Sequence, residues 1–470
     1  MDSYAHNLHI FFLPMMAPGH MIPMIDIAWK FATHGAKSTI ITTPVNASQF
    51  SQTIELGREK GLQIEISLVE FPCRESGLPE GCENLSSTTT PQMSINFLKA
   101  LDFLQEPVGD MLRKARPDCI VAGGYFWWAT DLATELGILR VGFYGTGFFP
   151  MCLFRSLRQN KPHEKVDSDY EEFVVPGVPG DIKITRKQLP SIITGDNKHP
   201  LADVLNKAFN SDQSSLGMIV NTFHELEPEY AAHYRDAHGV NTWHVGPVSL
   251  FGGRADSDGN NECLRWLDSK EPNSVVYACF GSMTFFRTPQ LREIAKGLES
   301  SGRQFVWVVR GESVNADWLF GEFQERVQGR GLVVGGWAPQ AQILEHAAVG
   351  GFVTHCGWNS LMEGVAAGVP MVTWPVTSEQ FLNEKLVAEV LGFGVPVGAE
   401  AWSERLEEGE CVEGERIAAA VGEVMGGGRE GVRRRAREVG AAARRAVEEG
   451  GSSEIEFRRL VAEIRGYRCA

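Results

Sequence analysis

Residues 337–380 read WAPQAQILEHAAVGGFVTHCGWNSLMEGVAAGVPMVTWPVTSEQ and hold the densest functional pattern in the chain. The apolar run 351–354 is typical of a short buried strand, and it ends in a His-Cys-Gly sequence. A helix then opens at the Trp-Asn-Ser sequence 358–360. Asn and Ser favour helix N-termini, where free N–H groups and the helix dipole bind a diphosphate. His355, at the carboxyl end of the strand, can donate a ring N–H to the same phosphate, although a lone histidine there is more often structural.

Other side chains of this box fit the rest of a sugar nucleotide. Trp337 precedes a short helix and can stack on a base, a contact worth roughly 1–3 kcal/mol; the alternative is a core tryptophan. Glu363 lies four residues after Asn359 and shares its helix face. Its carboxylate can accept both hydroxyls of a ribose, or it is a solvated helix charge. Glu379 and Gln380 follow the next buried strand and can pair with sugar hydroxyls. The order and spacing predict a site for a sugar attached to a nucleotide diphosphate.

The box resembles the signature of plant UDP-dependent glycosyltransferases that act on secondary products. The resemblance extends over nearly the whole chain. It is carried by FFLPMMAPGHMIP, TIITTPVNA, VNTFHELEPEYAAHYR, WHVGPVSL and NSVVYACFGSM, which are similar to the branch of flavonoid, terpenoid and steroid glucosyltransferases. It implies a GT-B fold, an α/β architecture of two facing Rossmann-like domains with a cleft between them. It also implies UDP-glucose as the donor, because the last position of the box is Gln380, as is common in glucose users.

The resemblance implies a role for each donor-site residue. The diphosphate is held by His355, Asn359, Ser360 and Ser282. The uracil stacks on Trp337 and the ribose binds Glu363. The sugar contacts Trp358, Glu379, Gln380 and Thr146, the last of which is equally plausible as a helix N-cap. The predicted donor site is completed by Ala338, Gln340 and Gly357.

The chain opens with a β-α-β pattern. Apolar strands are expected over 8–15 and 37–43, with a helix over 21–33 between them. Such crossover units build parallel sheets with binding sites at the carboxyl ends of the strands. His20 stands on the loop after the first strand, where a histidine can abstract a proton from a substrate oxygen about 3 Å away. A helix-start histidine is the ordinary alternative. The family resemblance favours the catalytic role, because the family's general base occupies this place.

One position departs from the family pattern. The family usually has an Asp near the end of the next strand, in a pattern like VADMFFPW, where this chain reads VAGGYFWW and places Gly123. An acid paired with a histidine orients it and stabilises its imidazolium. Three interpretations stay open. His20 acts alone on a hydroxyl as acidic as a phenol, whose pKa is about 10; or another carboxylate, such as Asp131, substitutes; or the protein is a weak or repurposed transferase.

The aromatic run after this glycine pair predicts a broad hydrophobic acceptor pocket. Its expected lining is Tyr125, Phe126 and Trp127. Two of the four aromatics that end at Trp128 are expected to be core residues instead. The polar segment 74–90 contains Gly and Pro and predicts a long loop that borders this pocket.

A chain of 470 residues is too long for one ordinary core, so two domains are expected. We expect an acceptor-binding domain over 1–248 and a UDP-sugar-binding domain over 262–451. The segment 249–261 is rich in Gly, Ser and Asp and predicts a linker. An amphipathic helix is expected within 452–470, and in the family it crosses back to the first domain.

Composition excludes several classes of protein. Lys and Arg number 44 against 59 Asp and Glu, a net charge of −15, which argues against a nucleic-acid partner. The nine cysteines show no CxxC pair or metal-ligand spacing, which suits a reducing compartment. There is no signal-peptide pattern and no run of 18 apolar residues. We therefore expect a cytoplasmic protein without an integral membrane segment; peripheral membrane association stays open, and monomer is the family default.

These observations predict an inverting glucosyltransferase. His20 removes the acceptor proton, the acceptor oxygen attacks the anomeric carbon, and UDP leaves toward the donors of His355, Ser360 and Ser282. The product is a β-glucoside, with a phenolic or flavonoid-like acceptor favoured over a steroid or terpenoid alcohol. No metal and no cofactor besides the co-substrate UDP-glucose is expected. A sugar-nucleotide binder or hydrolase with weak transfer stays open because of Gly123. A Rossmann oxidoreductase is a third class, which the lack of a GxGxxG motif disfavours.

Overall fold

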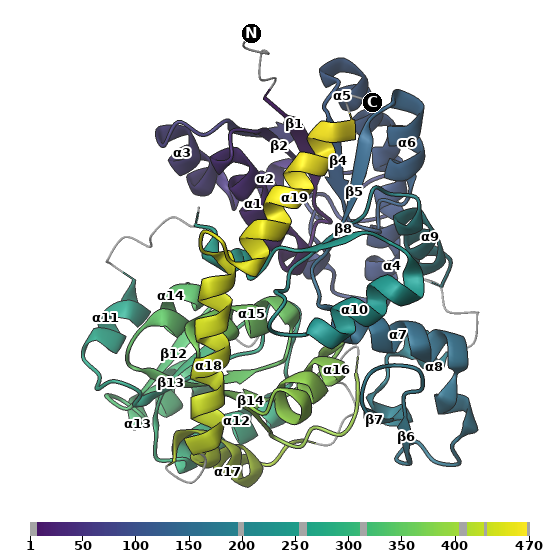
Figure 1. Ribbon diagram of the computed structural model, residues 1–470. Helices are drawn as coiled ribbons and strands as arrows, with labels where there is room; N and C mark the ends of the chain where they lie inside the picture. The colour runs from purple at the N-terminus through teal and green to yellow at the C-terminus, as the bar shows by residue number, and fades with distance from the viewer. Residues whose placement is uncertain are drawn as a thin grey trace.

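The computed structural model describes residues 7–195, 202–252, 261–310, 317–403, 411–426 and 430–467. Figure 1 shows two α/β domains stacked on each other, with the last two helices running along both. Each domain is built on its own parallel sheet. The two sheets with their flanking helices confirm the predicted pair of Rossmann-like domains. Most of the predicted linker, residues 253–260, lies outside the described residues.

The N-terminal domain contains a seven-stranded sheet in the order β3-β2-β1-β4-β5-β8-β9, with every neighbouring pair parallel. Its strands are β1 (His9–Leu13), β2 (Lys37–Thr42), β3 (Ile64–Leu68), β4 (Cys119–Ala122), β5 (Leu139–Tyr144), β8 (Met218–Val220) and β9 (Thr242–His244). Alternate residues of β1 face two different cores, Ile10 and Phe12 one, Phe11 and Leu13 the other. Burial on both faces explains why the strand is a continuous apolar run.

Helices cover both faces of this sheet. They are α1 (Pro18–Thr33), α2 (Pro44–Ser48), α3 (Ser51–Glu59), α4 (Pro91–Ala100), α5 (Gln105–Ala115), α6 (Trp128–Leu136), α7 (Phe148–Asn160), α8 (Ser191–Thr194), α9 (Ala202–Gln213) and α10 (Pro228–His238). An antiparallel pair, β6 (Glu172–Val174) and β7 (Lys183–Thr185), lies apart from the sheet beside α7 and α8 (Figure 1). Because α1 begins at Pro18, His20 lies in the first turn of a helix; the expectation that it stands in a loop is wrong.

The C-terminal domain contains a six-stranded parallel sheet in the order β12-β11-β10-β13-β14-β15. Its strands are β10 (Val275–Cys279), β11 (Gln304–Val309), β12 (Gly331–Gly335), β13 (Val349–Thr354), β14 (Met371–Thr373) and β15 (Gly394–Pro396). Its helices are α11 (Glu262–Asp268), α12 (Thr288–Ser300), α13 (Gln324–Arg326), α14 (Gln340–Glu345), α15 (Trp358–Ala367), α16 (Gln380–Lys385), α17 (Gly414–Met425) and α18 (Glu430–Val447). The box of residues 337–380 thus supplies two central strands and the helix between them.

The last helix, α19 (Ser452–Tyr467), packs on the N-terminal domain, whereas α18 lies along the C-terminal one (Figure 1). Phe457 packs edge-on against Phe31 of α1, with ring centroids 4.7 Å apart. The buried carboxylate of Glu454 pairs with Lys30 at 2.6 Å and with His34 at 3.2 Å. These contacts fasten the end of the chain to α1, the helix that carries His20 in its first turn.

Candidate active site

His20 sits where the first crossover leaves the sheet, and its backbone N–H donates to the carbonyl of Ala17 at 2.9 Å. Its ring meets Tyr125 edge-on, with centroids 5.8 Å apart. Burial lowers the pKa of His20 to about 4. Within the described ranges, no side chain hydrogen-bonds to the ring. His20 is therefore neutral at neutral pH, and a ring nitrogen is available to accept a proton.

The position of the family's Asp is open in this chain. A Cβ added at Gly123 would meet only the carbonyl oxygen of Phe143, at an ordinary contact distance of 3.7 Å. The alternative carboxylate, Asp131, lies exposed on α6 and makes no hydrogen bond to His20. The structure therefore gives no support to Asp131 as a substitute. No acid among the described residues pairs with the histidine.

The aromatic run divides between core and surface. Phe126 and Trp128 are fully buried and pack together with ring centroids 5.6 Å apart, so two of the four aromatics are core, as expected. Trp127 donates its Nε1–H to Asp102 at 2.9 Å and lies under the ammonium of Lys207. Of the three residues expected to line the acceptor pocket, only Tyr125 therefore contacts His20; the other two are fixed elsewhere.

In the C-terminal domain, Gln340 of α14 connects its own helix to α15 and to β10 by side-chain hydrogen bonds. Its amide Nε2 donates to the Ser360 hydroxyl at 2.9 Å and to the Glu363 carboxylate at 2.8 Å. Its carbonyl accepts from the Tyr277 hydroxyl at 3.4 Å. The Ser360 and Glu363 side chains are three residues apart and thus lie on one helix face, and Gln340 of α14 holds both in place.

His355 is packed between two glycines. A Cβ at either Gly281 or Gly357 would lie 2.4 Å from its Nε2, too close for any side chain, and Gly281 also has a left-handed backbone with φ +75°. Burial, and secondarily the charge of Arg310, lowers the pKa of His355 to about 4. Its Nδ1 is buried and has no hydrogen-bond partner among the described residues. The ring is therefore neutral and fixed at the start of α15.

Trp337 is 63% exposed, so the alternative of a core tryptophan is wrong. The guanidinium of Arg310 lies 4.5 Å from its ring centroid. Ala338 beside it is buried, and Ser282 follows β10 in a half-buried turn. An exposed aromatic plate at the carboxyl ends of the strands is a suitable surface for stacking a base.

Trp358 and Asn359 join the two domains. The indole of Trp358 is 2% exposed and donates to the carbonyl of Asn221 at 2.7 Å. It packs on Gly147, where a Cβ would come within 2.2 Å of the ring. Its side chain is therefore used at the domain interface. Asn359 donates to the carbonyl of Gly19 at 2.8 Å, which places the donor helix against the residue before His20.

The residues expected to contact the sugar differ in how many of their polar groups already have hydrogen-bond partners. The carbonyl of Gln380 accepts the backbone N–H groups of Val376 and Thr377, each at 2.9 Å, which leaves its amide NH₂ to donate. Burial raises the pKa of Glu379, whose charge in turn contributes, after burial, to a raised pKa of Tyr125. The N-cap of α7 is Gly147, so the N-cap alternative for Thr146 is wrong; its buried hydroxyl has no partner in the described part of the chain.

The sequence of the chain matches a known protein family. Residues 252–406 match the model of the family described as UDP-glucoronosyl and UDP-glucosyl transferase. Scopoletin glucosyltransferase of Nicotiana tabacum is 46% identical, over 98% of this chain and 98% of the relative. UDP-glucose flavonoid 3-O-glucosyltransferase 7 of Fragaria ananassa is 47% identical, over 97% and 96%. The chain belongs to the UDP-glycosyltransferase family.

Solved structures show the same fold. UGT73P12 of Glycyrrhiza uralensis, complexed with glycyrrhetinic acid 3-O-monoglucuronide, matches with a TM-score of 0.93 at 40% identity, over 98% of this chain and 96% of that chain. UGT71G1 of Medicago truncatula, complexed with UDP-glucose, matches with a TM-score of 0.80 at 26% identity, over 99% and 100%. This plant UDP-glycosyltransferase of specialised metabolism is therefore an enzyme with the GT-B fold.

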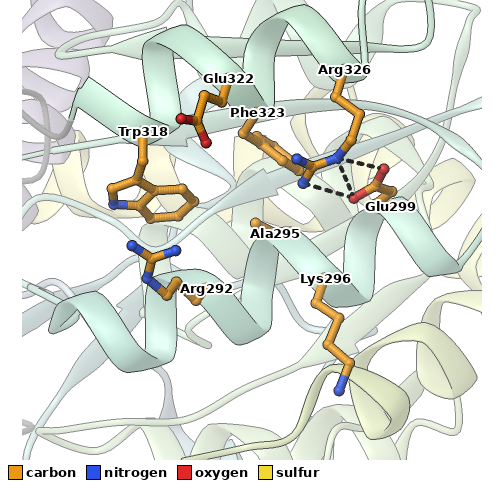
Figure 2. Close-up of a pocket in the computed structure, with 8 residues that line it drawn as sticks. All are labelled: Arg292, Ala295, Lys296, Glu299, Trp318, Glu322, Phe323 and Arg326. Carbon is orange, nitrogen blue, oxygen red and sulfur yellow. Dashed lines mark hydrogen bonds and ion pairs between the residues drawn. The ribbon is translucent and has the colours of Figure 1, made fainter.

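Outside this site, the described part of the UDP-glycosyltransferase has few features that could bind another ligand. In the described ranges no group of three or more His, Cys, Asp or Glu is placed to hold a metal ion. None of the helices described is both long and apolar enough to cross a bilayer. A separate pocket of about 210 Å³ lies between α12 and the segment 318–326. Figure 2 shows its lining, in which Arg292 lies against Trp318 and Arg326 pairs with Glu299. It shares no residue with the donor site.

Sequence reasoning missed two features of the UDP-glycosyltransferase. The first is the role of Gln340 as the hub of the donor-side hydrogen bonds, since an amide at a helix start looks ordinary in sequence. The second is Arg310, a cation immediately after β11. Its place at the carboxyl end of a parallel strand was a usable signal, because binding residues gather there.

Proposed function

We propose that this UDP-glycosyltransferase transfers glucose from UDP-glucose to a small hydrophobic acceptor with inversion, giving a β-glucoside. The observation that carries the proposal is a neutral His20 held beside the donor side. Asn359, at the start of the donor helix, is hydrogen-bonded to the residue before His20. This hydrogen bond between the domains therefore brings the proposed base, His20, close to the start of α15, where the diphosphate is proposed to bind.

His20 acts as the general base in this proposal. Its ring accepts the proton of the acceptor hydroxyl while the acceptor oxygen bonds to the anomeric carbon and the bond from that carbon to UDP breaks. Charge that develops on UDP is met by His355, Ser282, Ser360 and the N-terminus of α15. Trp337 stacks on the uracil and Glu363 binds the ribose. No metal or further cofactor takes part in the proposed reaction, which we assign to a monomer.

A phenolic acceptor is favoured because His20 has no acidic partner. A phenol, with a pKa of about 10, is easier to deprotonate than an aliphatic alcohol. The names of two relatives, for scopoletin and for flavonoids, favour the same class. One observation favours a steroid or terpenoid alcohol instead, namely that the UGT73P12 structure holds a glycyrrhetinic acid derivative.

The described cysteines are all free thiols, which supports a place in the reducing cytoplasm.

The proposal is tested by UDP release from UDP-glucose with and without a phenolic acceptor. We expect release to require the acceptor and to be matched by an equal amount of glucoside, whose anomeric coupling in NMR identifies the β form. Equal release without any acceptor would mean a hydrolase, the alternative that Gly123 keeps open. An α-glucoside would rule out a single displacement.

A further inference from the structure

Arg310 lies close to two residues of the proposed donor site, the indole of Trp337 and the imidazole of His355. In the register of the sheet, Cys279 of β10 lies opposite Val308, and Val309 lies opposite Gly335 of β12. Continued past the strand ends, this register sets Arg310 level with Gly281 on one side and Gly336 on the other. Adjacent strands are about 4.8 Å apart. Arg310 is therefore flanked by the turn that leads to Ser282 and by the turn that leads to Trp337.

Its side chain stays at this edge of the sheet. The guanidinium carbon lies 4.5 Å from the Trp337 ring centroid, within the range of a cation–π contact. The charge of Arg310 also lowers the pKa of His355, although burial contributes more. One cation thus acts on both the residue proposed to stack on uracil and the histidine proposed to hold phosphate.

Arg310 differs from several other arginines of this domain, which pair with carboxylates. Arg326, for comparison, donates twice to Glu299, at 2.9 and 3.0 Å. No carboxylate in the described ranges pairs with Arg310, and its buried Nε has no hydrogen-bond partner there. The half-buried guanidinium of Arg310 packs on an exposed ring, so N–H groups of this side chain are available to hydrogen-bond a ligand.

The other groups proposed for the diphosphate are uncharged. His355 is neutral at neutral pH, and Asn359, Ser360 and Ser282 carry no charge. A guanidinium presents its donors in a fork that matches phosphate oxygens. We propose that Arg310 is a phosphate-binding residue that contacts the diphosphate of the UDP-sugar and stabilises the departing UDP. This inference rests on the proposed function and adds a cation to the site.

The test separates phosphate recognition from base recognition. Dissociation constants of UDP and of uridine are measured by calorimetry for wild type, Arg310→Met and Arg310→Lys. Met keeps an unbranched stem against Trp337 without the charge. We expect Arg310→Met to weaken UDP by about 10- to 100-fold, as loss of a charged hydrogen bond does, and uridine by less than about 2-fold. Arg310→Lys keeps the charge but not the fork, so its effect on UDP is intermediate.

Arg326→Met is the matched control, because it removes an exposed arginine of the same domain that belongs to the pocket in Figure 2. We expect it to bind both ligands as wild type does. Equal loss of UDP and uridine in Arg310→Met would overturn the inference by showing a role in the base site or in folding. Unchanged UDP binding would overturn it as well. If wild type itself bound UDP no better than uridine, the proposed function would fail instead.

A second readout follows the departing group. Because charge on UDP increases as its bond to the sugar breaks, Arg310→Met is expected to lower kcat with UDP-glucose as well as to raise its KM. A variant that changed KM alone would limit Arg310 to ground-state binding and would overturn its role in UDP departure.

Discussion

The donor side and the acceptor side of this enzyme differ in how their polar groups are held. On the donor side, Gln340 joins Ser360 and Glu363, and two glycines enclose His355. On the acceptor side, the His20 ring has no hydrogen-bond partner among the described side chains, and Gly123 leaves open the place of an acid. The donor side is held by its own hydrogen bonds and close packing, and such preorganisation favours recognition of one fixed ligand. The acceptor side has few constraints, so single residues there can set which hydroxyl reacts.

Replacing the proposed general base, His20, is expected to give the largest effect. His20→Gln keeps a polar side chain of similar size but cannot take up the proton, so kcat is expected to fall by about 10³-fold, within the range for general-base catalysis. The KM for UDP-glucose is expected to stay within about 2-fold, since the donor network lies in the other domain. Steady-state kinetics of glucoside formation check both numbers. A variant with more than about a tenth of wild-type activity would show that another group removes the proton.

The exposed aromatic plate tests the donor side. Trp337→Ala is expected to weaken UDP-glucose binding by roughly 10- to 100-fold, the equivalent of about 1–3 kcal/mol of stacking. The melting temperature is expected to change little, because the side chain is 63% exposed. Tyr467→Ala is a control with the same exposure, 63%, on α19. Unchanged donor binding in Trp337→Ala would mean that uracil stacks elsewhere.

The pH dependence of transfer tests the acceptor side. With its pKa lowered by burial to about 4, from an ordinary 6.5, His20 stays neutral down to mildly acidic pH. We expect kcat/KM for a phenol to stay level as pH falls from 7 to about 5. The free energy of unfolding, by contrast, depends on pH in this range. The unfolded chain takes up the His20 proton near pH 6.5, whereas the folded chain does so near 4, so the free energy of unfolding falls as pH drops from 6.5 toward 4. An acid limb with a midpoint near 6.5 would mean that His20 is solvated, or that it is not the base.

The sequence was sufficient for parts of the molecule that lie close together along the chain. The strand that precedes His355 and the helix that starts at Trp358 both follow from local pattern and spacing. The burial of β1 on both faces follows from its continuous apolar run. In these cases the hydrophobic periodicity and the order of residues along the chain are enough to place the side chains.

The sequence was insufficient where distant segments meet. The ring of Trp358 is buried against Asn221 and Gly147 of the other domain, and no local pattern announces such a partner. Trp127 looks like its aromatic neighbours, yet Asp102 and Lys207 hold it at the surface. Asp131 is near Gly123 in sequence, but its place on α6 exposes it. Such contacts depend on the packing of whole domains.

The central claim is that His20 acts without an acidic partner and that this limits the acceptor. It is tested most directly by UDP release from UDP-glucose with phenols of graded acidity and one steroid alcohol, for wild type and Gly123→Asp. A Cβ at this position is accommodated, because its one neighbour within 4 Å is a backbone oxygen at an ordinary contact distance of 3.7 Å. The account predicts that wild type turns over acidic phenols and hardly any alcohol, and that Gly123→Asp raises the rate with the alcohol by about 10-fold. Rapid turnover of the steroid alcohol by wild type would contradict it and would show that another group supports His20.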